Sequence, residues 1–140
     1  MATDLQRIEA FIKKHHLLSL STMGETLWCC SLFYAYDTAE AAFIVASDRE
    51  TQHMHNVSLN PFVAGTVAWE TKTVGKIQGI QFSGEMEKIA DHSDQASLYL
   101  ERFPYARVMN PTLWKITIHR IKMTDNTLGF GKKITWSREI

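Results

Sequence analysis

The chain has 140 residues, 45% of them hydrophobic, and its 15 basic and 15 acidic side chains cancel to a formal net charge of zero. This length predicts a single domain, residues 1–140, that can bury a hydrophobic core of its own. The balanced charge argues against nucleic acid or an anionic membrane surface as a partner, and a small ligand or a protein partner is expected instead.

The composition also predicts a cellular setting. The first residues contain an early acid and no uninterrupted apolar segment, and no stretch reaches the ~18 apolar residues of a membrane span. Cys29 and Cys30 are adjacent, so in a strand their side chains point to opposite faces and an ordinary disulfide between them is not expected. We therefore expect a reduced, cytoplasmic protein.

A metal site is not expected from the spacing of the ligand-type residues. The sequence has no second cysteine pair of the kind that zinc frameworks use. His53 and His55 resemble a metal-binding pair, but residues two apart on a helix point roughly 200° away from each other.

The N-terminal third reads as a helix followed by a hairpin. Thr3 and Gln6 have the spacing of a capping box, which predicts a helix ending near residue 15. Residues 17–22 and 26–36 then read as two strands joined by a tight turn. The second strand carries apolar or aromatic residues on both faces, which favours a barrel with outer helices or a subunit contact.

The central stretch predicts strand, corner, helix, turn and strand. Residues 42–46 form an apolar run, and Ser47 and Glu50 behind it have capping-box spacing, which predicts that a helix begins there. Residues 60–61 are Asn-Pro, which ends the helix, and residues 62–69 form a second β-rich run.

The next strand is long and contains two glycines. It is expected over residues 76–89, with Gly79 and Gly84 inside it. Glycine inside a strand indicates a bulge, a bend at a barrel corner, or a close approach of a ligand to the backbone.

The last third predicts one more helix and the final strands. The helix is expected over residues 92–102, a loop over 105–111, a strand over 114–123 and a short strand over 134–136. With six or seven strands and three short helices, the chain is expected to be mainly β (α+β), an antiparallel barrel with peripheral helices.

The corner after the first central strand is the first candidate site. Ser47, Arg49 and Thr51, followed by His53 and Asn56, supply hydroxyls, a guanidinium and a helix start, a set that suits a phosphate group. The alternative is an ordinary capped helix with a solvated face, and the residues alone favour that alternative.

Two further segments are candidates. Gln78 and Gln81 flank a glycine and could supply amides to the edge of a planar ligand, although exposed glutamines beside a bulge explain the pattern equally well. Trp114, Phe130 and Trp136 are core or dimer contacts, or aromatics packed along a cofactor. No catalytic triad, glycine-rich phosphate loop or paired carboxylates are present at a recognisable spacing, so no catalytic residue is assigned.

Several segments together resemble a known family. The order of AFIVAS, the corner, LNPFVAGTV and GIQFSGEMEKI is similar to the pyridoxamine-phosphate-oxidase-like FMN-binding split barrels. IQGIQFSGE, ERFPYAR and TDNTLGFGKKITW resemble the YhbP-type branch of that family, whose activity is uncharacterised.

The resemblance implies a six-stranded antiparallel Greek-key split barrel and a homodimer with FMN in two grooves at the subunit interface. It implies that the flavin phosphate is held by Ser47, Arg49 and Thr51. It also implies that the isoalloxazine edge lies along two strands, at Cys30, Ser31, Leu32, Gln78 and Gln81.

The chain departs from the pyridoxamine oxidases at two places. It has Asp48-Arg49-Glu50 where they have a basic Arg-Lys corner, and a GFGKKITW tail where they have arginine and histidine for substrate. The leading hypothesis is an FMN-dependent oxidoreductase that acts on a small molecule. The alternative is a non-enzymatic split-barrel dimer that lacks flavin or binds another flat ligand such as haem.

Overall fold

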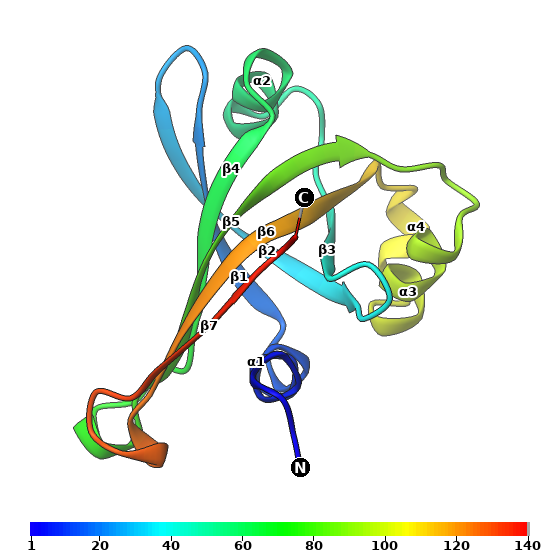
Figure 1. Ribbon diagram of the computed structural model, residues 1–140. Coiled ribbons are helices and arrows are strands. Elements are labelled where there is room, and N and C mark those ends of the chain that lie inside the picture. Colours follow the sequence, from blue (N-terminus) through cyan, green and yellow to red (C-terminus); the bar gives the residue numbers. More distant parts are fainter. Residues whose placement is uncertain (140) are drawn as a thin grey trace.

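A computed structural model describes residues 1–139, and the strands in this part of the chain form one antiparallel sheet (Figure 1). The strands are β1 (Leu17–Met23), β2 (Leu27–Asp37), β3 (Ala42–Ala46), β4 (Phe62–Ala68), β5 (Gln78–Lys88), β6 (Leu113–Asp125) and β7 (Lys133–Ser137). The helices are α1 (Asp4–Lys14), α2 (Gln52–Leu59), α3 (Asp94–Arg102) and α4 (Ala106–Met109). Short 3-10 turns lie at Val74–Lys76 and Asn126–Leu128.

The sheet closes on itself. Its strand order is β3-β2-β1-β4-β5-β6-β7, and β3 also pairs with β6, so that six strands form a closed barrel and β7 is added outside it. The structure thereby confirms the predicted six-stranded antiparallel barrel with peripheral short helices.

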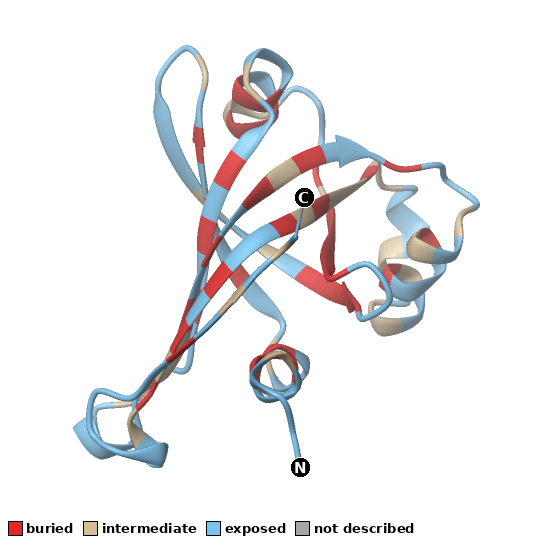
Figure 2. Ribbon diagram, in the orientation of Figure 1, coloured by how far each residue is buried: buried red, intermediate tan, exposed pale blue. Residues whose placement is uncertain are grey.

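The core lies inside this barrel because the strands alternate between buried and exposed residues. In β1 and β4 every second residue is buried and the others are exposed, as the bands along β4, β5 and β6 in Figure 2 also show. Helix α1 adds Ile8 and Ile12 to the core, and the predicted capping box of Thr3 and Gln6 at its start is confirmed.

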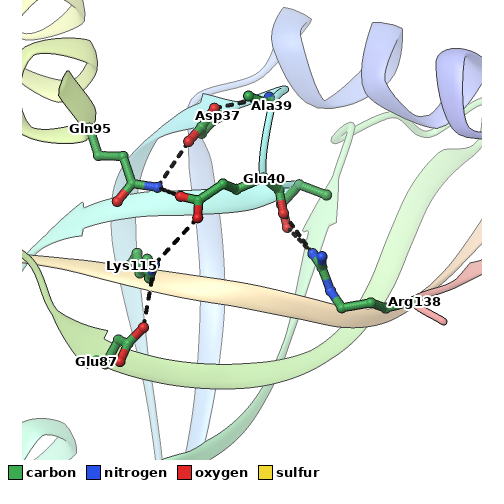
Figure 3. A network of polar contacts seen from close by, with 8 residues as sticks. Asp37, Ala39, Glu40, Glu87, Gln95, Lys115 and Arg138 are labelled. Carbon is green, nitrogen blue, oxygen red and sulfur yellow. Dashed lines mark hydrogen bonds and ion pairs between the residues drawn. The ribbon is translucent and has the colours of Figure 1, made fainter. Parts of the chain in front are cut away.

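Two strands share one edge of β6. Strand β3 pairs with residues 113–117 of β6, and β7 pairs with residues 120–124 farther along. Arg138 lies where the two partners meet: its guanidinium donates to the carbonyl oxygens of Ile118, Glu40 and Ala41 at 2.6–3.1 Å. Figure 3 shows Arg138 pointing to Glu40. The backbone carbonyls at this junction therefore have a donor.

The turn between β2 and β3 is held by charged side chains (Figure 3). Lys115 lies 3.6 Å from a Glu40 carboxylate oxygen and 3.4 Å from one of Glu87. The Gln95 amide donates to Asp37 and to Glu40, which connects α3 to the same turn. The network links the turn to α3, β5 and β6.

A bulge interrupts the pairing of β5 with β6. Ser83 pairs with Arg120 and Gly84 pairs with Ile118, so His119 is an extra residue on β6. A Cβ atom at position 84 would lie 2.3 Å from the carbonyl oxygen of Thr117. Of the three alternatives that the glycines left open, a bulge is found at Gly84, whereas the register at Gly79 is regular.

Two expectations about helices were wrong. Helix α2 begins at Gln52 with Thr51 as its N-cap, so Ser47 and Glu50 form no capping box; the Ser47 hydroxyl instead contacts His53. The expected loop 105–111 contains the single turn α4, which ends at Asn110 in the left-handed conformation. One turn of four residues is too short to give a periodic pattern in the sequence.

The described part of the chain lacks two features. None of its helices has the length and apolar character needed to cross a membrane. Residues 1–139 also contain no group of three or more histidine, cysteine or acidic side chains placed to hold a metal ion.

Replacing Gly84 with alanine is expected to lower the free energy of unfolding by about 1–3 kcal/mol, because the new methyl group meets backbone that cannot move aside easily. The matched control is Gly75→Ala, since nothing lies within 4 Å of a Cβ atom there. Urea unfolding of the two variants checks this. Equal stabilities would show that the bulge tolerates a side chain.

Candidate functional site

The corner between β3 and α2, residues 47–51, lies beside the loop that precedes β6. Ala46 pairs with Leu113, and the Ser47 N–H donates to the Thr112 carbonyl at 3.1 Å. The indole N–H of Trp114 donates to the Ser47 carbonyl at 2.9 Å. Both backbone groups of Ser47 are therefore fixed by the start of β6.

His53 connects the two ends of the corner. Its Nε2 lies 2.8 Å from the Ser47 hydroxyl and 3.2 Å from the Thr51 hydroxyl. Ser47 and His53 are 9% and 8% exposed, and burial lowers the pKa of the imidazole below its ordinary value of 6.5. The ring is therefore neutral at pH 7, with Ser47 as its hydrogen-bond partner.

The start of α2 presents backbone donors. The Thr51 hydroxyl donates to the Asp48 carbonyl at 2.8 Å and accepts from the Met54 N–H, so it acts as a cap. The N–H groups of Gln52 and His53 have no acceptor within residues 1–139. Free N–H groups at a helix start favour an anion.

Helix α2 is fixed on the tip of the β1–β2 hairpin. The fully buried Asn56 donates from Nδ2 to the Thr22 hydroxyl at 3.1 Å and to the Thr26 carbonyl at 2.8 Å. A Cβ atom on Gly24 would lie 2.7 Å from the backbone of Asn56, so only glycine permits this approach. These contacts set the position of His53, one turn earlier.

A cavity of about 500 Å³ opens beside the corner, between residues 46–50 and residues 109–112. This volume is within the range of small-molecule sites. The exposed Arg49 guanidinium lies 5.7 Å from the ring centre of Trp114, a cation–π contact. The Asp48 carboxylate accepts from the Glu50 N–H at 3.0 Å, so one of the two acids is bonded to the turn itself.

The remaining predicted site residues lie on β2 and β5, away from this cavity. Cys30 and Leu32 face the barrel interior and pack against the core. The pKa of the Cys30 thiol is raised to about 11, mainly by burial and to a smaller extent by the neighbouring Cys29. Gln78 is half-buried and donates to the Asp125 carboxylate at 3.1 Å.

Ser31 and Gln81 point to the outer face of the sheet, opposite to Cys30, Leu32 and Gln78. The registers place Ser31 opposite Ser19, Ser19 opposite Thr66, Thr66 opposite Gln81 and Gln81 opposite Lys122. These side chains form one polar row across the outer face.

The structure thus brings together Ser47, Arg49 and Thr51 and divides the other five predicted residues between two faces of the sheet. Cofactor contact stays a prediction for all eight. The sequence placed His53 in the corner set but assigned it no cofactor contact, and the structure makes it the centre of the corner's hydrogen bonds. Its position two residues after the N-cap Thr51 allows the ring to face the cap.

Fold and site together define an antiparallel split barrel with a polar corner at the end of its third strand. Residues 5–125 match the family described as pyridoxamine 5'-phosphate oxidase. A UPF0306 protein from Cronobacter sakazakii is 44% identical over 137 residues, which is 96% of this chain and 95% of that one. The chain belongs to the pyridoxamine 5'-phosphate oxidase family.

Solved structures with the same fold are more distant in sequence. A haem binding protein from Mycobacterium smegmatis has a TM-score of 0.79 at 11% identity, and the match covers 98% of this chain and 59% of that one. A FAD-binding protein from Mesorhizobium loti has a TM-score of 0.72 at 15% identity, covering 87% of this chain and 92% of that one. At these identities both similarities are evidence of a shared fold alone.

Acid is expected to destabilise the folded protein through His53. Its pKa is lower in the folded protein than the ordinary 6.5, so the unfolded chain binds the proton more readily and stability falls as the pH drops below about 6.5. His53→Gln removes this contribution. Urea unfolding at pH 7.5 and pH 5.5 should show a smaller loss of stability for the variant than for the wild type.

The same experiment needs a control for other histidines. Burial also lowers the pKa of His15, at the end of α1. His15→Gln should therefore reduce the acid sensitivity independently, and the two effects should add because the two residues lie on different helices and share no hydrogen-bond partner. An unchanged pH dependence in His53→Gln would contradict the role assigned to burial of this ring.

Proposed function

We propose that the protein binds FMN, with the flavin phosphate at the corner (residues 47–51) and the start of α2, and that it is a flavin-dependent oxidoreductase acting on a small molecule. The supporting observation is the cavity of about 500 Å³ that Ser47 and Arg49 line, immediately before the free N–H groups at the start of α2. Family membership supports the same proposal.

The residues of the corner fit a phosphate group. The Gln52 and His53 N–H groups and the Arg49 guanidinium are all donors, and phosphate oxygens accept such bonds strongly. When the His53 Nε2 carries its proton it donates to Ser47, which leaves the Ser47 hydroxyl hydrogen for the ligand. The Thr51 hydroxyl hydrogen is directed to Asp48, so Thr51 contributes by starting the helix.

The acids beside Arg49 reduce the positive field without removing it. Glu50 is exposed, and its charge is screened by water and salt. Asp48 is bonded to the turn. Binding in this corner therefore depends on backbone and hydroxyl donors as well as on one guanidinium.

A bound flavin would supply the electron transfer. The chain supplies position: Asn56 holds α2 on the β1–β2 hairpin, His53 orients Ser47, and Trp114 holds both the Ser47 carbonyl and the Arg49 guanidinium. No acid or base from the protein is required in this proposal.

Haem is the second candidate ligand, because the same fold occurs in the haem binding protein from Mycobacterium smegmatis. In that case the protein is a binding or storage module, or an enzyme of another kind. The absorption spectrum of the purified protein separates the candidates, since flavin and haem absorb at different wavelengths.

We further propose that the protein is a homodimer that uses the outer face of the β1–β2 hairpin. Leu27 is 73% exposed, Met23 59% and Phe33 52%, and Leu17 pairs with Phe33 on the same face. Large apolar side chains that gather on one face favour a subunit contact. A second copy of the chain is the partner that the family resemblance implies.

Replacing Arg49 with glutamate is expected to weaken FMN binding roughly tenfold to hundredfold, because a hydrogen bond to a charged group contributes about 1.5–3 kcal/mol. Quenching of flavin fluorescence measures the affinity. Arg7→Glu is the matched control, since Arg7 is an exposed residue of α1 and the charge change is the same. A protein that neither retains nor quenches FMN would refute the flavin proposal, and an unaffected Arg49→Glu variant would refute the phosphate site.

Replacing Leu27 with lysine is expected to convert the dimer into a monomer, because a charge would be buried against apolar side chains. Light scattering behind a sizing column gives the mass. Leu128→Lys is the control, because Leu128 is 52% exposed on a 3-10 turn outside the β1–β2 hairpin. A monomeric wild type, or a dimer that survives Leu27→Lys, would contradict the proposed interface.

A further inference from the structure

A second cavity lies on the outer face of the sheet, where β5 pairs with β6. Its volume is about 320 Å³, and it is lined by Gln81, Phe82, Ser83, Arg120 and Lys122. Apart from the buried Phe82, these are exposed polar or basic side chains. None of them belongs to the corner at the end of β3.

The bulge in β6 places Arg120 and Lys122, which share one face of the strand, on the outer face of the sheet. His119 is the extra residue, and beyond it Arg120 pairs with Ser83 and Lys122 with Gln81. Ile121 between them is fully buried. Without the extra residue the alternation in this half of β6 would be reversed, because a shift of one position exchanges the two faces of a strand.

The positive charges of Arg120 and Lys122 are not balanced within the described chain. Neither forms an ion pair with a carboxylate of residues 1–139. Glu85 is the next residue on this face of β5, opposite Thr117, and it forms no such pair either. Two cations roughly 7 Å apart on one strand face repel each other, and a bound anion would remove that repulsion.

We infer that this cavity binds an anionic small molecule that carries phosphate or carboxylate oxygens. Arg120 presents a planar fork that can donate two parallel hydrogen bonds, and Lys122 adds a compact ammonium. The Gln81 amide and the Ser83 hydroxyl are neutral donors on the neighbouring strand. Four donors from two strands therefore surround one hollow with two positive charges.

This site is separate from the corner proposed for the flavin phosphate, although Gln81 is also one of the residues predicted to lie along the isoalloxazine edge. Trp114, which contacts the corner, and Arg120 are six positions apart on β6, or roughly 20 Å of strand. The inference therefore does not require that the protein bind flavin, and the two proposals can fail independently.

Calorimetric titration of the full-length protein at low salt tests the inference, with pyrophosphate as the phosphate probe and succinate as the carboxylate probe. The wild type is expected to bind at least one of them at one site per chain. Arg120→Gln combined with Lys122→Gln should weaken that binding at least about tenfold, because two charged hydrogen-bond donors are lost. The preferred probe identifies the anionic group of the ligand.

The matched control is Lys13→Gln combined with Lys14→Gln, which removes two exposed adjacent cations from α1. It should bind as the wild type does. Arg120→Lys keeps the charge but loses the fork, so an intermediate loss is expected. Thermal unfolding confirms that the variants are folded.

Three outcomes would overturn the inference. The first is a wild type that binds neither probe, and the second is an Arg120/Lys122 double variant that binds as well as the wild type. The third is an equal loss in the Lys13/Lys14 control, which would mean nonspecific attraction between the probe and exposed cations. Loss of FMN binding in Arg49→Glu alone leaves the outer-face site intact.

Discussion

The pairing of β3 with the first half of β6 is the constraint on which the rest of the molecule depends. It closes the barrel, and it places Ala46 opposite Leu113 so that the corner emerges beside residues 109–112. Trp114 then lies where it can hold the Ser47 carbonyl and the Arg49 guanidinium together. A shift of one residue in this register would turn Trp114 away and separate the cavity from the corner.

The same constraint explains the irregular middle of β6. Its edge is occupied first by β3 and then by β7, and the extra residue His119 lies between the two paired segments. Gly84 allows the close backbone approach at the bend, and Arg138 satisfies the carbonyls of the junction. The bulge at His119 therefore lies at the junction of β3 and β7, and it also places Arg120 on the outer face of the sheet.

The sequence predicted those features that depend on local pattern. Alternation and turn residues located the strands, and the family resemblance supplied their order. The capping box at Ser47 and Glu50 was wrong because Thr51 offers an equally good cap, and contacts from His53 and Trp114 decide between them. The corner could therefore be located from the sequence, but its hydrogen bonds could not.

The outer-face site shows a different limit of sequence reasoning. Gln81 was a candidate from the sequence, but Lys122, which pairs with it across the sheet, lies 41 positions later in the chain. This pairing depends on the bulge in β6, and no local sequence pattern predicts where that bulge lies. The two polar regions also differ in physical character. The corner combines one stacked cation with backbone and hydroxyl donors, whereas the outer face carries two exposed cations. Because salt screens exposed charges most strongly, anion binding at the proposed outer-face site should depend on ionic strength, whereas phosphate binding at the proposed corner site should depend mainly on geometry.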